Sequence, residues 1–172
     1  MALIDTILKR KSIRKYTDDT IPEDKLNKIL QAGLLAPTSR NIKPCEIYIV
    51  KDKDVLKKLA GAKKAGAGML TGCNAAVVVL ADSEKADTWI EDSSIAMSFM
   101  MLMAEEQGIG NCWVQIHLRS DADGNDAEQN VREILSVPEK FRVVGILSLG
   151  IPAENTEPHT IDEADMRKVH TI

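Results

Sequence analysis

The stretch from Ile95 to Ala104 constrains the fold more than any other part of the chain. It lies within a helix predicted over residues 91–107 and reads Ile-Ala-Met-Ser-Phe-Met-Met-Leu-Met-Ala. A helix that is apolar on nearly every side must also be covered on every side. In a chain of 172 residues, a second subunit is one way to cover the outer face. We therefore expect a dimer, and a central core helix within a monomer is the alternative.

The remaining pattern predicts helices alternating with apolar strands. Helical spacing or helix-start signals occur over residues 3–10, 22–36, 54–60 and 125–135, and strand-like runs occupy 46–50, 75–81, 111–116 and 142–150. The run over residues 75–81 is apolar throughout, which is typical of a strand covered on both faces. This mixture predicts an α+β domain of two or three layers. The polar tail from Pro152 is too weakly patterned to fold alone, so we expect it to lie across another part of the molecule.

Composition narrows the class of protein. Hydrophobic residues make up 44% and charged residues 28% of the sequence, as in an ordinary globular domain, and the length fits one domain over residues 1–172. The net charge of −4 and the lack of a basic run beyond residues 9–15 argue against a nucleic-acid-binding protein.

Cellular location and metal content are predicted from the cysteines and from the apolar runs. Cys45, Cys73 and Cys112 are odd in number, and no pair has metal-ligand spacing. The histidines add no metal pattern, so we expect no metal and reduced thiols in a cytoplasmic protein. The start of the chain lacks a signal-peptide layout. The longest apolar run, residues 95–104, is much shorter than the ~20 residues that cross a bilayer, so we expect no membrane span.

The first candidate site is the cationic stretch that follows the first helix. Arg10, Lys11, Ser12 and Arg14 bring three cations and a hydroxyl together within five residues. Arginine offers a planar fork to a phosphate, lysine a point charge, and serine a short donor. The apolar Ile13 between them indicates that the segment is ordered against the core. A solvated basic patch is the alternative.

The second candidate is the loop Ala36-Pro37-Thr38-Ser39-Arg40-Asn41. A helix ends there at a proline, and small hydrogen-bonding residues follow it. Such a loop can offer hydroxyls, an amide and backbone N–H groups to a planar polar ligand. An ordinary polar turn is the alternative.

The third candidate is the stretch from Gly108 to Gln115, which enters a strand. Glycine at this entry allows a ligand to approach the backbone closely, and Gln115 can hydrogen-bond the edge of a heterocycle. A core position is the alternative for Trp113. Cys112 has no base at an interpretable offset, so we do not assign it as a nucleophile.

Taken in order, these segments resemble the nitroreductase superfamily. The stretches that carry the resemblance are Arg10-Lys11-Ser12-Ile13-Arg14-Lys15-Tyr16, Ala36 to Asn41 with Pro44, Gly108 to Trp113, Leu149-Gly150-Ile151-Pro152-Ala153-Glu154, and Lys168-Val169-His170. Each motif is weak alone, but their order spans nearly the whole chain. The resemblance implies a three-layer fold with a central mixed, mainly antiparallel sheet flanked by helices. It also implies an intertwined homodimer with two flavin mononucleotide (FMN) sites at the interface.

The resemblance also assigns roles to individual residues. Arg10, Lys11 and Ser12 would hold the phosphate and ribityl chain, and Arg14 would lie at the pyrimidine edge as the electrostatic catalytic residue. The group expected from the other subunit consists of Pro37, Thr38, Ser39 and Asn41. The group expected along the isoalloxazine consists of Trp113, Val114 and Gln115.

One stretch departs from the family pattern. Many members carry Lys-x-Arg or Lys-Pro-Arg after the last strand, whereas this chain has Glu157-Pro158-His159. Glu157 has the wrong sign for a phosphate ligand, while His159 can donate a hydrogen bond to one. We therefore expect weaker FMN binding or compensation by Lys11.

The activity implied by the resemblance is a ping-pong reaction. NADH or NADPH would pass hydride to flavin N5, and an electron-poor acceptor such as a nitroaromatic compound or a quinone would then take it. A flavin-dependent dehalogenase or a flavin-cleaving enzyme on the same scaffold is an alternative. From another class, the alternatives are a non-catalytic FMN-binding or redox-sensing dimer, or a structural dimer that has lost flavin.

Overall fold

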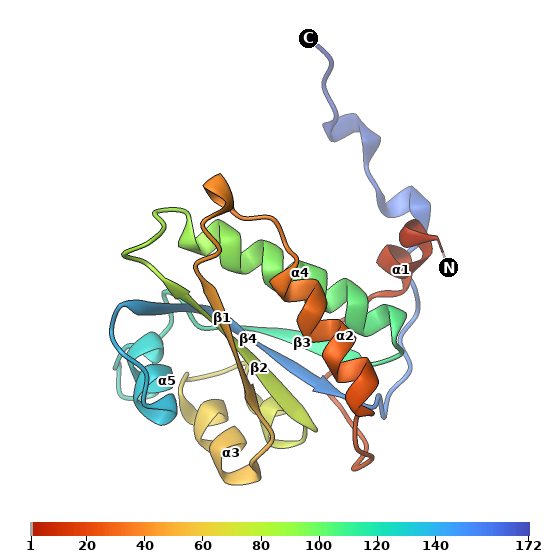
Figure 1. The fold of residues 1–172 in the computed structure, drawn as a ribbon. Coiled ribbons are helices and arrows are strands. Elements are labelled where there is room, and N and C mark those ends of the chain that lie inside the picture. Colours follow the sequence, from red (N-terminus) through yellow and green to blue (C-terminus); the bar gives the residue numbers. More distant parts are fainter. Residues whose placement is uncertain (1) are drawn as a thin grey trace.

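A four-stranded antiparallel sheet forms the centre of the computed structural model, which describes residues 2–172 (Figure 1). The strands are β1 (Cys45–Val50), β2 (Ala75–Asp82), β3 (Gly110–Gln115) and β4 (Phe141–Gly150). Their order across the sheet is β1-β2-β4-β3, and each neighbouring pair is antiparallel. All four predicted strands are therefore present, and the predicted α+β class is confirmed.

Helices cover both faces of this sheet and give three layers (Figure 1). They are α1 (Leu3–Lys9), α2 (Glu23–Leu34), α3 (Lys53–Gly61), α4 (Trp89–Glu106) and α5 (Ala127–Leu135). Four short 3-10 helices lie at Ser39–Asn41, Gly68–Thr71, Ile161–Glu163 and Met166–Lys168. The three-layer arrangement agrees with the fold that the resemblance implied.

Strand β2 shows why an uninterrupted apolar run was needed. Its neighbours are β1 and β4, and every one of its residues is buried. Because side chains alternate along a strand, Val77 and Val79 pack with α2 and α4, while Val78 and Leu80 pack with α3. Both faces of β2 therefore contribute to a core.

Helix α4 is covered on one side only within a single chain. Met97 and Met100 are fully buried on its inner side. On its outer side, Ile95 and Phe99 remain 37% and 41% exposed. The single chain thus leaves uncovered part of the apolar surface that the sequence requires to be covered.

Helix α1 lies across the C-terminal end of α4 with its apolar side chains turned outward. Leu3 and Ile4 are 65% and 47% exposed, whereas the polar Thr6 is buried and donates from Oγ1 to Glu106 Oε2 at 2.9 Å. The apolar face that predicted this helix therefore does not enter the core of its own chain.

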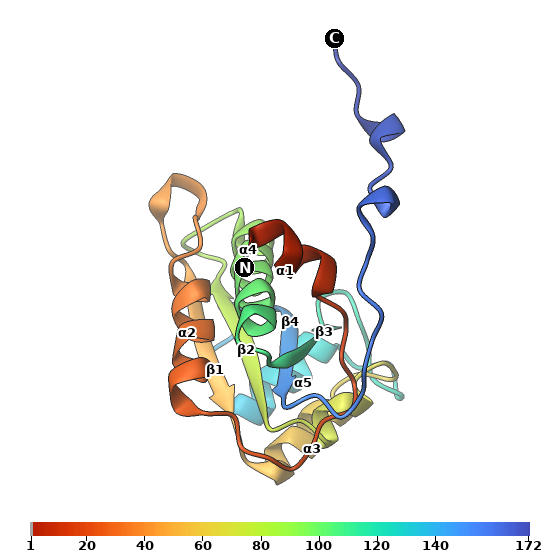
Figure 2. The same cartoon turned by 90° about the vertical axis from the view of Figure 1, so that its right-hand side faces the viewer.

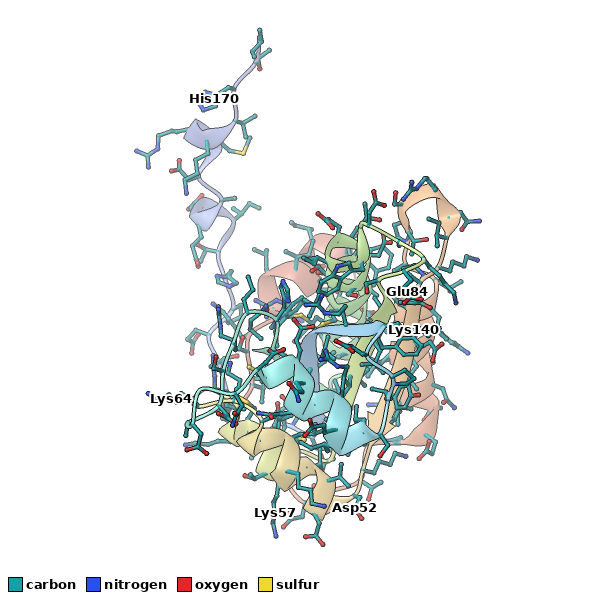
Figure 3. The ribbon with its side chains drawn as sticks, turned by 90° about the vertical axis from the view of Figure 1, so that its left-hand side faces the viewer. Asp52, Lys57, Lys64, Glu84, Lys140 and His170 are labelled. Carbon is teal, nitrogen blue, oxygen red and sulfur yellow. The ribbon has the colours of Figure 1, made fainter. Side chains whose placement is uncertain are left out.

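The C-terminal segment first follows the N-terminal one and then leaves the body of the molecule (Figure 2). Ala153 N donates to Lys15 O at 2.9 Å, and His159 N donates to Leu8 O at 2.7 Å. Beyond this point the chain projects outward, with His170 far from the sheet (Figure 3). Within residues 2–172 we find no helix that combines the length and apolarity required of a membrane span.

Candidate functional site

The cationic segment after α1 is built into the edge of the sheet. Ser12 forms a parallel bridge with Asn111 of β3, and Ile13 N donates to Asn111 O at 2.9 Å. Ile13 is 7% exposed, so the prediction that it orders the segment against the core is confirmed. The cationic residues beside it therefore start from a fixed backbone.

Glycine at position 110 is what allows this close packing. A Cβ atom there would lie 2.9 Å from Ile13 Cγ2 and 3.1 Å from Pro152 Cγ. The space over Gly110 is therefore taken by the chain itself, where the sequence had suggested room for a ligand. Gly108 has a different role, because its φ of +70° and its N–H hydrogen bond to Glu105 O end helix α4.

Arg10 and Ser12 are half-buried and keep their donors unused. Within residues 2–172, neither the Arg10 guanidinium nor the Ser12 hydroxyl donates a hydrogen bond. Arg10 lies close enough to α4 for its field to act on Glu105, whose pKa burial raises against the fields of Arg10 and Lys9. Free donors on an ordered, half-buried segment are suited to an anionic ligand.

His159 approaches the same segment from the C-terminal side. Its Nδ1 lies 3.1 Å from Lys11 Nζ and 2.6 Å from Glu163 Oε2. One ring nitrogen cannot accept and donate at once, so the tautomer decides which contact is a hydrogen bond. The structure thus brings His159 to Lys11, while Glu157 is exposed nearby.

Arg14 and Lys15 are exposed between two anchored side chains, those of Ile13 and Tyr16. Arg14 Nη1 donates to Ser12 O at 3.2 Å, and Arg14 makes no ion pair with any described residue. Sequence reasoning gave no role to Glu154, whose carboxylate accepts from the backbone of both exposed residues. The Pro-Ala-Glu motif was visible in the sequence but did not reveal this contact.

Strand β3 carries the aromatic and amide side chains of the site. Trp113 Nε1 donates to Gln115 Oε1 at 2.9 Å, and Gln115 Nε2 donates to His117 O at 3.1 Å. Lys63 Nζ also donates to Gln115 O at 2.9 Å. Val114 points to the opposite side, where it is 1% exposed within the core of α3 and α5, so only its backbone is available to a ligand.

The loop with the remaining predicted residues, Pro37, Thr38, Ser39 and Asn41, lies at the other end of α4 (Figure 1). Ser39 N donates to Asp92 Oδ1 at 2.9 Å in the first turn of that helix, and Lys43 N donates to Thr38 Oγ1 at 3.0 Å. Arg10 lies near Glu105 in its last turn. At ~1.5 Å per residue, the two groups of one chain are about 20 Å apart along α4.

An apolar groove of about 380 Å³ lies along the C-terminal half of α4, beside α1 and α2. Its lining residues are Leu3, Thr6, Ala32, Phe99, Leu102, Met103 and Glu106. Within residues 2–172 no three His, Cys, Asp or Glu side chains are arranged to hold a metal ion. The donors that the described residues bring together at this site are cationic and hydrogen-bonding, and they lie beside an uncovered apolar surface.

Comparisons with known proteins match the sequence and the fold of this chain. The model described as the Nitroreductase family matches residues 7–67 and 61–151. A solved structure of an FMN-dependent nitroreductase from Clostridium difficile R20291 superposes with a TM-score of 0.95, is 41% identical and is covered over 98% of each chain.

Two curated relatives extend the comparison. A protein from Archaeoglobus fulgidus, whose name joins NADH dehydrogenase and NAD(P)H nitroreductase, is 34% identical over 161 residues, which cover 91% of this chain and 89% of the relative. An NADPH-flavin oxidoreductase from Vibrio harveyi is 32% identical over 168 residues, covering 90% of this chain and 67% of the relative.

Proposed function

Since the chain belongs to the nitroreductase family, we propose that it is an FMN-dependent oxidoreductase that uses NADH or NADPH. Its acceptor is an electron-poor compound such as a nitroaromatic or a quinone, reduced in a ping-pong cycle. Bound FMN supplies the hydride chemistry, and the protein supplies binding, orientation and electrostatics.

The observation that carries this proposal is the set of unused donors on the ordered cationic segment. Arg10 and Ser12 keep their donors free, and Lys11 and His159 lie beside each other. Such a donor set fits the phosphate and ribityl hydroxyls of FMN. His159 supplies the donor at the position where many family members have a cation.

Arg14 is the residue that we assign to the pyrimidine edge. Its guanidinium is exposed, carries no ion pair within the described chain, and is therefore available to a ligand. A fixed cation at that edge stabilises the negative charge that reduction places there. Trp113 and Gln115 are held by each other and by His117, so they offer a preformed surface to the ring.

We propose that the working unit is a homodimer. The uncovered side of α4, the outward apolar face of α1 and the projecting C-terminal segment all lack cover within one chain. A two-fold partner would cover these surfaces and would bring residues 37–41 of one chain to the cationic segment of the other. The 20 Å separation along α4, estimated at ~1.5 Å per residue, then ceases to be an obstacle. The three cysteines are free, which suits a reducing cytoplasm.

The cofactor anchor is tested with the double variant Arg10→Ala/Ser12→Ala. It should purify without the visible absorbance of flavin, because it lacks both unused donors. Lys57→Ala, which removes a cation from the exposed side of α3 (Figure 3), is the control and should stay yellow. Full flavin occupancy in the double variant would show that the phosphate binds elsewhere.

The role of Arg14 is tested by the reduction potential of the bound flavin. Arg14→Ala should fold normally, should shift the potential to a more negative value and should slow flavin reduction by NAD(P)H. Spectroelectrochemistry and stopped-flow absorbance measure the two effects. NAD(P)H oxidation with a nitroarene or a quinone separates the enzyme from a non-catalytic FMN-binding module.

A further inference from the structure

The carboxylate of Glu154 holds two consecutive backbone N–H groups of the cationic segment. Its Oε1 accepts from Arg14 N at 2.6 Å and from Lys15 N at 3.2 Å. Hydrogen bonds to an ionised acceptor are roughly twice as strong as neutral ones. The hydrogen bond from the backbone N–H of Arg14 lowers the pKa of Glu154 most, and the one from Lys15 lowers it further, against the effect of desolvation. The carboxylate is therefore ionised at neutral pH.

The residues on either side of this pair are fixed by packing. Ile13 is buried over Gly110, and Tyr16 Oη donates to Ile13 O at 2.6 Å. Gly150 makes room for the Tyr16 ring, because a Cβ atom there would lie 2.6 Å from Tyr16 Cδ1. The side chains before and after the pair are thus anchored in the molecule.

Arg14 and Lys15 have no such anchor, because their side chains face outward. The N-terminal and C-terminal segments pair on either side of them. Thr17 N donates to Ile151 O, and Ala153 N donates to Lys15 O, both at 2.9 Å. Glu154 is the group that binds the amides of both exposed residues. Because Glu154 binds the backbone of Arg14 and makes no ion pair with its guanidinium, the charge of Arg14 stays available to a ligand.

We infer that Glu154 is a positioning residue that fixes the backbone of Arg14 and so places its guanidinium at the pyrimidine edge of the flavin. This inference rests on the proposed function, because it needs Arg14 to face the cofactor. In this role Glu154 would act through the backbone of Arg14 and not by contact with the cofactor. Losing its carboxylate would leave two N–H groups without a protein acceptor and would let the Arg14 backbone move.

Nuclear magnetic resonance of the flavin-free protein tests the contact directly. A short bond to a carboxylate moves an amide proton downfield, so the Arg14 and Lys15 amide protons should be shifted in this way. As pH falls through the lowered pKa of Glu154, both resonances should move together. The charged groups whose fields act on that carboxylate are Lys15 and Arg14. In Glu154→Gln the titration should vanish, and amide resonances that keep titrating there would overturn the inference.

The effect of Glu154 on the flavin through Arg14 is tested by a double-mutant cycle that measures the reduction potential. Glu154→Ala should shift the potential in the same direction as Arg14→Ala and weaken FMN binding roughly tenfold. Glu154→Gln, which keeps a neutral acceptor, should have a smaller effect. In the Arg14→Ala background, Glu154→Ala should shift the potential no further, because it acts through Arg14. Glu139→Ala, at an exposed glutamate beside the opposite end of β4, is the control.

The possible failures are distinguishable. If Arg14→Ala shifts the potential and both Glu154 variants do not, the role of Glu154 is wrong while the proposed function stands. Additive shifts in the double variant would also overturn it, because Glu154 would then act independently. If Arg14→Ala leaves the potential unchanged, Arg14 has no electrostatic role, and the inference falls with that part of the proposal. If Glu154→Ala does not fold, Glu154→Gln carries the same cycle.

Discussion

The two helical layers of this molecule differ in how completely one chain covers them. Between residues 2 and 172, none of the exposed large hydrophobic side chains belongs to α3 or α5. On the opposite side, α1 leaves Ile7 44% exposed and α4 leaves Phe99 41% exposed. The layer of α3 and α5 is covered within one chain, while the layer of α1 and α4 leaves apolar side chains exposed, and these form the surface of the proposed dimer.

This difference shows that an apolar helix face can have two meanings. The Leu56 side chain on α3 and the Phe99 side chain on α4 both follow helical spacing. Leu56 is fully buried within its own chain, whereas Phe99 is not. Helical spacing alone therefore does not distinguish an apolar face that its own chain buries from one that its own chain leaves exposed.

The largest expected effect on stability comes from removing the buried carboxylate of Glu128 in the layer of α3 and α5. Glu128 is 2% exposed and accepts hydrogen bonds from Arg142 Nε at 2.9 Å and from Val143 N at 3.1 Å, with His117 also bound. Glu128→Ala leaves Arg142 without its partner and should lower the free energy of unfolding by about 3–5 kcal/mol. Urea denaturation measures this value. A loss below that of an exposed control, Glu133→Ala, would contradict it.

The same carboxylate predicts a pH dependence. Burial acts to raise the pKa of Glu128, but hydrogen bonds from Arg142 and His117 outweigh burial and hold the pKa below its ordinary value. Because the folded pKa is depressed, this stabilisation is present above the unfolded pKa and is lost as pH falls through the folded pKa. The fall in unfolding free energy between neutral and acid pH should be smaller in Glu128→Gln than in the native protein.

The next effect compares the two layers directly. Leu56→Ala should lower the free energy of unfolding by about 3 kcal/mol, because it leaves a cavity in a finished core. Phe99→Ala, measured at a protein concentration at which the native chain is monomeric, should lower it by roughly 1 kcal/mol or less, as expected for a partly exposed side chain. Equal losses in the two variants would remove the distinction between core and interface.

A charge on the exposed apolar side of α4 should separate the subunits of the proposed dimer. Phe99→Asp places an ionised group on the uncovered side of α4, and we expect the dimer dissociation constant to rise at least tenfold, or about 1.4 kcal/mol. Sedimentation velocity over a range of concentrations measures it. Lys57→Asp on the outside of α3 is the matched control and should leave the assembly unchanged. A native protein that is monomeric and does not bind FMN would refute the dimeric account itself.

The smallest effect concerns the thiols. Burial raises the pKa of Cys73 to about 11, and its side chain is fully buried beside the finished core. Cys45 at the start of β1 is only partly buried. Iodoacetamide should therefore modify Cys45 well before Cys73 in the native protein, as peptide mass spectrometry would show. Labelling of Cys45 and Cys73 at one rate would indicate that the core beneath α3 and α5 opens readily.

Several features of the molecule could be predicted from local sequence alone. The strands are recognisable as β-branched and apolar runs, in which successive side chains point to opposite faces of the sheet. The burial of Ile13 was predicted because it is the one apolar residue within a cationic stretch. The same alternation would have placed Val114 on the opposite side from Trp113 and Gln115. The resemblance grouped these three consecutive residues, whereas the period of a strand separates them.

What the sequence determined by itself is the set of helices and strands and the expectation that α4 is covered on every side, and both follow from the spacing of residues along the chain. The family was recognised from the resemblance of several motifs in order. Only the tertiary structure decided that Glu154 holds the backbone of Arg14, that Ile13 fills the space over Gly110, and that α1 faces outward. The physical reason is that each of these contacts joins residues far apart in the chain, and their meeting depends on how the whole sheet is ordered.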